Sequence, residues 1–253
     1  MRVDLNADLG ESFGAYRIGD DAGLLASVTS ASIAAGFHAG DPTVLRATIR
    51  LAKARGVAIG AHPGFPDLVG FGRRELKVSP AEIEDFVLYQ VAAVAGVAAA
   101  EGIPLQHVKP HGALYNMAAR DGAIATAIAR AVAAFDSSLR LIGPPGSELL
   151  ASARALGLAV GAEAFADRAY RSDRMLLPRS EPGAVIYEPA VVIARAVKLV
   201  LDRIIVAIDG TPLAIEADTI CIHGDTPGAA ALAASVRAGL EANGIAVMRI
   251  GPR

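Results

Sequence analysis

Histidines that directly follow apolar runs are the residues of this chain best suited to chemistry. Four of the five histidines lie within two residues of a glycine at such a place. They are His38, His62, His111 and His223, in Gly36-Phe37-His38-Ala39-Gly40-Asp41, Gly60-Ala61-His62-Pro63, Lys109-Pro110-His111-Gly112 and His223-Gly224-Asp225. An imidazole transfers protons, donates hydrogen bonds or binds metal ions near neutral pH. Because α/β proteins build their sites where strands end, this pattern predicts an enzyme.

The amino-terminal strand pattern carries a polar face. Asp4, Asn6 and Asp8 alternate with apolar residues, and alternate residues share one face of a strand. A polar face near the end of a barrel strand indicates a site, because a buried carboxylate needs a partner. Asp8 is therefore a candidate base and Asn6 a candidate substrate-binding residue. The alternative is that Asp4 or Asn6 is a satisfied structural polar group.

A second strand pattern places His107, Lys109 and His111 on one face. Lys109 is one of only four lysines, and a buried lysine is costly unless it pairs with carboxylates or binds a substrate anion. We expect Lys109 to hold an anionic group and His111 to transfer a proton. His107 lies nearer the start of the strand and is expected to be a packing residue.

A third strand pattern ends in acidic residues. Glu163 and Asp167 share a face and Arg168 follows; together they are suited to bind a carboxylate and orient a water. A surface ion pair between Asp167 and Arg168 without a role is the alternative. The long loop 64–77 has the length of a functional lid, and it offers Arg73 and Arg74 to an anion.

Strand patterns alternate with helical patterns along almost the whole chain. The expected strands are 3–6, 31–35, 57–61, 105–109, 139–143, 158–163, 219–223 and 246–250, and the expected helices are 43–54, 80–101, 121–135, 147–156, 191–201 and 228–243. This alternation predicts an α/β fold with a mainly parallel sheet. Residues 203–217 break it, since two short β runs around Asp209-Gly210 predict a β-hairpin insertion.

Composition excludes several classes of function. The net charge of −2 argues against a nucleic-acid partner. No apolar run is both long and uninterrupted enough for a bilayer, and the amino terminus enters a strand pattern directly, so neither a membrane partner nor a signal peptide is expected. The single cysteine, Cys221, suits a reducing compartment and is expected to be a buried core thiol. We therefore expect a cytoplasmic protein.

Several catalytic fingerprints are absent from the sequence. It contains no P-loop, no dinucleotide-binding glycine motif, no Gly-x-Ser-x-Gly elbow and no His-Glu-x-x-His. We therefore expect no ATP site of the P-loop type. Aspartates and histidines at strand ends are able to hold a divalent metal ion, but their spacing here identifies no ligand set, so a metal stays an open alternative.

Seven stretches in a fixed order resemble the lactam-utilisation (LamB/YcsF) family. They are Asp4-Leu5-Asn6-Ala7-Asp8-Leu9-Gly10-Glu11, Gly36-Phe37-His38-Ala39-Gly40-Asp41-Pro42, Gly60-Ala61-His62-Pro63, Gly70-Phe71-Gly72-Arg73-Arg74, Val108-Lys109-Pro110-His111-Gly112-Ala113-Leu114-Tyr115-Asn116, Glu163-Ala164-Phe165-Ala166-Asp167-Arg168-Ala169-Tyr170 and His223-Gly224-Asp225. The resemblance implies a single-domain, seven-stranded β/α barrel over 1–253, related to that of polysaccharide deacetylases.

The resemblance also implies an activity and its partners. It implies an ATP-dependent 5-oxoprolinase reaction, in which the lactam ring of 5-oxoproline opens to L-glutamate. ATP would be a co-substrate of the assembled enzyme, and two other subunits would supply its hydrolysis. A homo-oligomer is also open.

The residues and the resemblance together define a predicted site. The predicted catalytic residues are Asp8, His62, His111 and Glu163. The predicted substrate-binding residues are Asn6, His38, Asp41, Arg73, Arg74, Lys109, Asn116, Asp167, Arg168 and His223. Two alternatives remain beside this interpretation: a metal-dependent amide hydrolase or deacetylase that acts alone, and a non-catalytic scaffold subunit.

Overall fold

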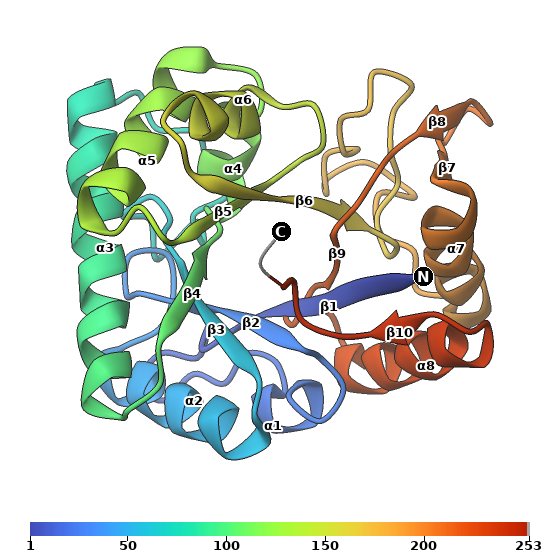
Figure 1. Cartoon of the computed structure of the whole chain (residues 1–253), viewed down its shortest axis with the longest axis horizontal. Helices are drawn as coiled ribbons and strands as arrows, with labels where there is room; N and C mark the ends of the chain where they lie inside the picture. The colour runs from blue at the N-terminus through green and yellow to red at the C-terminus, as the bar shows by residue number, and fades with distance from the viewer. Residues whose placement is uncertain (252–253) are drawn as a thin grey trace.

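Parallel strands close into a barrel in the computed structural model, which describes residues 1–251 (Figure 1). The ring runs β1 (Arg2–Leu9), β2 (Ser30–Ala34), β3 (Ala58–His62), β4 (Leu105–Val108), β5 (Arg140–Gly143), β6 (Ala159–Phe165) and β9 (Thr219–Ile222), and β9 pairs back to β1. The expected closed, parallel β/α barrel is therefore confirmed. The assignment of 1–253 to one domain stays a prediction, and residues 252–253 lie outside the described part.

The eighth expected strand does not enter the ring. β10 (Ala246–Val247) is shorter than the expected 246–250 and pairs only with the start of β1, at Arg2 and Val3. The next residues along the same edge of β1, beginning with Asp4, pair with β9. Since β9 and β10 share one edge of β1, eight strand patterns produce a barrel of seven strands.

Helices surround the barrel on its outside (Figure 1). They are α1 (Asp21–Leu24), α2 (Pro42–Arg55), α3 (Pro80–Ala100), α4 (Gly112–Ala118), α5 (Gly122–Phe135), α6 (Glu148–Ala155), α7 (Pro189–Asp202) and α8 (Ala229–Ala242). All six expected helices are present. The short α1 and α4 were not predicted, because neither is long enough to show a helical period. Ser79 and Glu82 form the capping box expected at the start of α3.

The expected hairpin is confirmed as β7 (Ile204–Val206) paired antiparallel with β8 (Pro212–Ala214). It follows α7 and lies outside the ring (Figure 1).

One helix departs from the expectation that nothing in the chain is apolar enough for a bilayer. Within the described residues, α3 alone reaches the length and composition of a membrane span. It packs on α5 and on the strands β3 and β4 through a face that includes Val87, Val91 and Val94. These contacts are those of a helix that covers the barrel.

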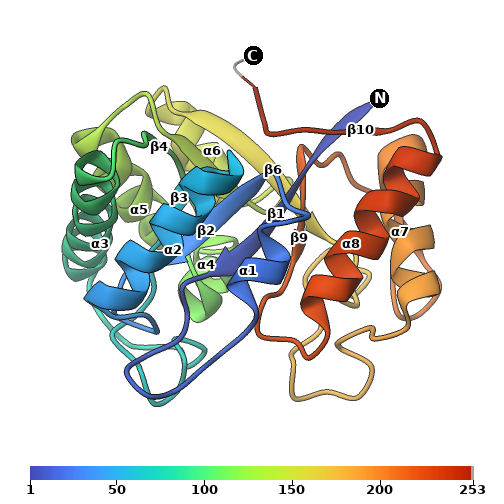
Figure 2. The same cartoon turned by 90° about the horizontal axis from the view of Figure 1, so that it is seen from below.

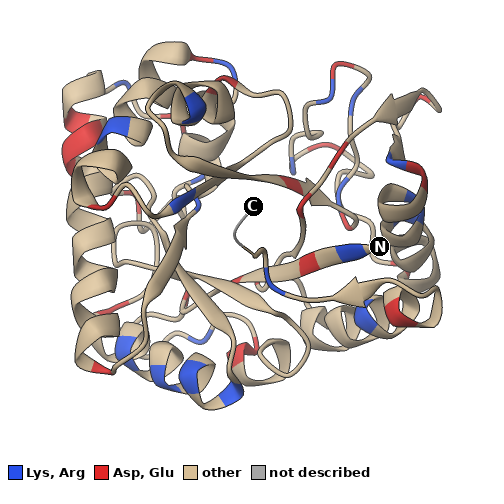
Figure 3. Cartoon of the chain, in the orientation of Figure 1, with Lys and Arg blue, Asp and Glu red and all other residues tan. Residues whose placement is uncertain are grey.

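The loops after β1, β3 and β6 project from one end of the barrel, opposite the two chain termini (Figure 2). This is the carboxyl-terminal end of the parallel strands, where β/α barrels carry their sites. Figure 3 shows that the charged residues of α2 are basic, whereas those near the start of α3 are acidic.

Candidate active site

A cavity of about 690 Å³ opens at the carboxyl-terminal mouth of the barrel. Residues in the last part of β1, β3 and β6 and directly after β4 and β9 line it, together with the loops around 73–75 and 171–180. The lining includes the sequence-predicted residues Asp8, His62, Arg73, Lys109, His111, Asn116, Glu163, Arg168 and His223. Residues distant in the sequence thus come together at the place that the strand-end pattern predicts.

Lys109 forms the centre of a buried ionic network below the cavity. Its Nζ atom lies 2.6 Å from Asp8 Oδ1 and 2.9 Å from Glu163 Oε1. It also lies 3.1 Å from Asn6 Oδ1 and 3.3 Å from Cys221 Sγ. Asn6 in turn donates to Glu163 Oε1 at 3.0 Å. Cys221 is buried in the core as expected, and its thiol also contacts this polar network.

The charges of this network stabilise one another. Burial alone would raise the pKa of Asp8, but the charges of His62 and Lys109 outweigh it and hold that pKa well below its ordinary value. Burial likewise opposes the charge of Lys109, yet Asp8, Cys221 and Glu163 raise the Lys109 pKa well above its ordinary value. An ionised Asp8 with a depressed pKa is a weak base near neutral pH. Lys109 is already paired, which does not favour the predicted role of holding a substrate anion.

Backbone carbonyl groups fix the rings of His62 and His111. His62 Nδ1 lies 2.7 Å from the Lys109 carbonyl oxygen, and His111 Nε2 lies 2.8 Å from the Phe71 carbonyl oxygen. The two remaining nitrogens, His62 Nε2 and His111 Nδ1, lie only 3.0 Å apart. His62 Nε2 is also 3.3 Å from Asp8 Oδ2.

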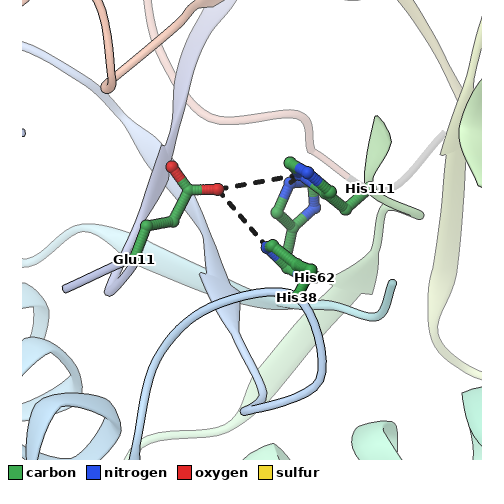
Figure 4. Close-up of side chains that lie close together, drawn as sticks. All are labelled: Glu11, His38, His62 and His111. Atoms are coloured by element: carbon green, nitrogen blue, oxygen red, sulfur yellow. Dashed lines mark hydrogen bonds and ion pairs between the residues drawn. The ribbon is translucent and has the colours of Figure 1, made fainter. Parts of the chain in front are cut away.

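Glu11 and His38 complete a cluster with these two histidines (Figure 4). Glu11 Oε1 lies 3.4 Å from His38 Nε2 and 3.7 Å from His111 Nδ1. One ligand atom from each of the four residues lies within 4.8 Å of the others. Burial and the neighbouring charge of Asp8 raise the pKa of Glu11 well above its ordinary value. Burial lowers the pKa values of His38 and His111, so both rings are neutral near pH 7.

The loop 64–77 folds closely onto the start of α4. The Ala113 amide donates to the Gly72 carbonyl at 2.9 Å. Gly112 has a φ of 56°, and a Cβ there would lie 2.6 Å from the Gly72 carbonyl oxygen, so this approach requires glycine. The contact brings the Phe71 carbonyl to His111 and Arg73 to the cavity.

Arginines form much of the cavity rim, namely Arg73, Arg120, Arg168, Arg171 and Arg179. Arg168 is buried and donates to the carbonyl groups of Ala184 at 3.0 Å and Leu177 at 2.6 Å. These bonds fix its guanidinium in place. Arg73 and Arg179 share one carboxylate, that of Asp225, at 2.6 and 3.6 Å.

Asp167 is buried behind the rim and contacts His223, not Arg168. Its Oδ2 atom lies 3.0 Å from His223 Nδ1. The alternative of a surface ion pair between Asp167 and Arg168 is wrong, because both side chains are buried and each is bonded elsewhere. Asp167 thus orients a cavity-lining histidine.

Two predicted substrate-binding residues are placed away from the cavity. Asp41 is the N-cap of α2, where its carboxylate accepts from the amides of Thr43 and Val44. Arg74 turns away from the mouth and forms an ion pair with Asp67. The sequence Asp41-Pro42 is itself typical of a helix start, and this signal favours the capping role.

Three predicted residues of the interior have contacts of other kinds. Asn6 lies below the cavity in the Lys109 network, and His38 belongs to the Glu11 cluster behind the lining. His107 is buried with a pKa lowered to about 3 by burial and by nearby Lys109. Its Nε2 atom lies 3.2 Å from Ser32 Oγ, in keeping with a packing role.

Two residues outside the predicted site stand out in the structure. Glu11 joins the histidine cluster, and its position directly after the strand-ending Leu9-Gly10 is the signal that could have identified it. Tyr115 lines the cavity with a buried hydroxyl that has no hydrogen-bond partner among the described residues. Its signal was its place in α4, directly after the strand end that carries His111.

A closed parallel barrel with a charged cavity at its carboxyl-terminal mouth defines a β/α-barrel protein with a small-molecule site. Within that class the chain belongs to the LamB/YcsF family, whose model matches residues 3–252. This confirms the resemblance found in the sequence.

Comparison with individual proteins agrees with this membership. The chain is 58% identical over 247 residues to a 5-oxoprolinase subunit of Chloroflexus aggregans, covering 98% of both chains. It is 51% identical to the corresponding 5-oxoprolinase subunit of Syntrophobacter fumaroxidans, covering 99% of both. A crystal structure of a lactam utilization protein from Thermus thermophilus has a TM-score of 0.93 at 51% identity, covering 98% of this chain and 99% of that one. A structure from Enterococcus faecalis, at 14% identity and a TM-score of 0.58, shows the fold alone.

Proposed function

We propose that this chain is the lactam-binding, ring-opening subunit of an ATP-dependent 5-oxoprolinase, which converts 5-oxo-L-proline to L-glutamate. The names of its full-length relatives support the reaction. The observation that carries the assignment to this chain is the mouth cavity, in which Asp8, Lys109 and Glu163 lie beneath a rim of arginines. A cavity of this kind suits a small anionic ring.

The rim is suited to the carboxylate of the lactam. Arg168 presents a fixed guanidinium, and burial together with nearby Arg179 and Arg73 lowers its pKa to about 10. Like charges that crowd a buried arginine are stabilised when an anion binds among them. We therefore assign the substrate carboxylate to the side of the cavity that carries Arg168 and Arg73.

Tyr115 and Glu163 are suited to the amide of the ring. Both line the cavity, and neither the Tyr115 hydroxyl nor Glu163 Oε2 has a well-formed hydrogen bond to a described residue, although burial and the neighbouring Glu163 carboxylate raise the Tyr115 pKa well above its ordinary value. Buried polar atoms without partners are costly. A lactam presents its N–H and C=O on the same side of the ring, so it can donate to Glu163 and accept from Tyr115. This pairing would satisfy both atoms at once.

The proposed roles of the catalytic residues follow from their surroundings. Asp8 keeps its negative charge and holds Lys109 and His62 in place, so we do not assign it the abstraction of a proton. The neutral ring of His111 carries no spare proton for the leaving nitrogen near pH 7. In this proposal the Glu163 carboxylate takes a proton from the attacking water and passes it to the leaving nitrogen, whose N–H it already accepts, while the water oxygen bonds to the carbonyl carbon and the C–N bond breaks.

ATP enters through partner subunits in this proposal. The chain has no P-loop, and amide opening needs a driving force that the other subunits would provide. We propose two such partners, an assembly in the cytoplasm and no nucleic-acid or membrane partner. A homo-oligomer of this chain is compatible with it.

Glutamate release from 5-oxo-L-proline tests the proposal. The assay compares this chain alone, the two partner subunits alone and all three together, each with and without ATP. We expect glutamate only from the complete mixture with ATP. Release by the partners without this chain would refute the assignment of ring opening to it.

A matched pair of variants distinguishes catalysis from scaffolding. Glu163→Gln removes a buried cavity charge, whereas Asp202→Asn removes an exposed charge at the end of α7. We expect Glu163→Gln to lose most activity while copurification with the partners persists, and Asp202→Asn to behave as wild type. A scaffold subunit would tolerate both changes.

A metal-dependent amide hydrolase that acts alone is the second candidate. The cluster of Glu11, His38, His62 and His111 favours it, because these are residue types that bind divalent cations. Release of an amine from a simple lactam or acetamide by this chain alone, without ATP and abolished by a chelator, would support this candidate over the first.

A further inference from the structure

The hydrogen bonds of His62 and His111 determine which nitrogen of each ring carries its proton. A carbonyl oxygen only accepts, so His62 Nδ1 carries a hydrogen toward Lys109 and His111 Nε2 carries one toward Phe71. In a neutral imidazole the other nitrogen then bears a lone pair. These other nitrogens are His62 Nε2 and His111 Nδ1.

The two lone-pair nitrogens face each other across 3.0 Å. Two neutral rings at that distance repel, so the pair is stabilised by a positive charge between the two nitrogens. Two carboxylate oxygens add to the crowding, with Asp8 Oδ2 at 3.3 Å from His62 Nε2 and Glu11 Oε1 at 3.7 Å from His111 Nδ1. A buried group of acceptors like this is stabilised by a positive charge at its centre.

We propose that Glu11, His62 and His111 bind a divalent first-row metal ion, through Glu11 Oε1, His62 Nε2 and His111 Nδ1. Bonds of about 2.0–2.1 Å in a tetrahedral site place neighbouring ligand atoms about 3.3 Å apart. The observed separations of 3.0 Å between the two nitrogens and 3.7 Å between Glu11 Oε1 and His111 Nδ1 lie on either side of that value. The backbone carbonyls of Lys109 and Phe71 are then the outer partners that fix each ligand ring.

His38 is a positioning residue in this site and not a ligand. Its ring is stacked on His111, with centroids 3.7 Å apart and planes 4° from parallel. A metal ion lies near the plane of each imidazole that binds it, and two parallel planes at that spacing do not share one ion. His38 Nε2 instead lies 3.4 Å from Glu11 Oε1, where its N–H orients the carboxylate (Figure 4).

Two of the three proposed ligands border the cavity. His62 and His111 both line that cavity, whereas Glu11 lies behind them. A metal ion there would polarise an amide carbonyl or lower the pKa of a bound water. The role of this metal ion in lactam opening rests on the proposed function. Metal binding itself is tested without lactam, ATP or partner subunits.

Zinc titration of the metal-stripped, untagged chain tests the proposal. Isothermal titration calorimetry with ZnCl₂ is expected to show one ion per chain with a Kd that is roughly micromolar or tighter. The same sample with Co²⁺ is expected to develop a d–d absorption band typical of nitrogen and oxygen ligands. Saturating Zn²⁺ is expected to raise the unfolding midpoint by about 5 °C.

Matched variants locate the ion. His62→Gln and Glu11→Gln should each weaken zinc binding by at least about 100-fold, and His38→Gln by roughly 10- to 100-fold. His223→Asn, which changes a cavity histidine outside the cluster, should leave the affinity within about twofold.

The results that overturn the site differ from those that overturn the proposed function. Absence of stoichiometric zinc binding by the wild-type chain, or equal loss in His223→Asn, overturns the metal site. Where a variant fails to fold, the wild-type Co²⁺ spectrum still decides, because a spectrum without histidine ligation overturns the site. The zinc titration does not measure glutamate release by the full assembly. The metal site and the proposed ring-opening function can therefore fail independently of each other.

Discussion

Replacing Lys109 by methionine should destabilise the barrel strongly, since it removes the one cation between two buried carboxylates. Lys109 Nζ lies 2.6 Å from Asp8 and 2.9 Å from Glu163, and its side chain is 2% exposed. Methionine fills a similar volume, so the change acts mainly on charge. Breaking a buried ion pair on one side costs about 3–5 kcal/mol. We expect a loss of this size in the free energy of unfolding at pH 7.

Protonation sets an upper bound on this cost. A carboxyl group with an ordinary pKa near 4 can take up a proton at pH 7 for about 4 kcal/mol, because each pKa unit is worth about 1.4 kcal/mol. One protonated carboxyl would then hydrogen-bond its neighbour, as like charges in one site do not both stay ionised. The variant is therefore destabilised by a few kcal/mol, and not by the full cost of burying a bare charge.

The same reasoning fixes the pH dependence. In the wild type the lowered pKa of Asp8 contributes stability that is present above the unfolded pKa, about 3.9, and is lost only as the pH falls through the folded value. In Lys109→Met the folded chain holds one more carboxyl proton than the unfolded chain. The free energy of unfolding of the variant therefore rises by about 1.4 kcal/mol per pH unit on acidification between pH 7 and 5. The difference between wild type and variant should thus shrink over that interval.

Urea unfolding at pH 5, 6 and 7 measures this difference. Lys198→Met is the control, because it removes an exposed lysine paired with Asp202 on α7 and should change stability by less than about 0.5 kcal/mol. The double change Lys109→Met with Glu163→Gln should recover part of the loss. A Lys109→Met chain within about 1 kcal/mol of wild type, or a loss that does not vary with pH, would show that the network is not the charge pair described.

Three further outcomes are expected of the proposed assembly. Asp8→Asn should lower turnover roughly 100-fold while the partners still copurify, because it releases Lys109 and His62 from their positions; near-normal turnover would remove this positioning role from Asp8. Arg73→Ala should lower kcat/KM for the lactam by about 10- to 100-fold, mainly through KM, whereas Arg74→Ala should change it less than about twofold. Similar losses in the two arginine variants would contradict the placement of Arg74. The isolated chain should hydrolyse no ATP above background, and turnover that is lost on mutation of its own mouth residues would disprove this.

Local patterns were sufficient to predict most of the barrel. Apolar runs with glycine stops and capped helical repeats act over a few neighbours, so strands and helices could be located without knowledge of their partners. The pairing of β10 with the start of β1 depends on how the ring closes. No local pattern encodes that closure, and the last strand was therefore expected to be longer than it is.

The site was predictable in its residue types more than in its contacts. Strand ends meet at one mouth in any parallel barrel, which is why His62, His111 and Glu163 could be grouped in advance. Side-chain direction in a loop has no such rule, so Arg73 and Arg74 could not be told apart. Glu11 follows a glycine outside the strand period, and its approach to the histidines of β3 and β4 exists only in three dimensions.

The contact between β1 and β9, which closes the barrel, makes the active site depend on strands from both ends of the chain. Asp4 on β1 accepts a hydrogen bond from Thr219 on β9 across 215 residues, and Asn6 bonds both Thr219 and Glu163. During synthesis the polar interior thus stays incomplete until the ribosome has released the last ring strand. Conversely, a compound that binds in the mouth cavity would stabilise the pairing of β1 with β9. Such a compound should compete with substrate, and it should also slow proteolysis at loops distant from the cavity.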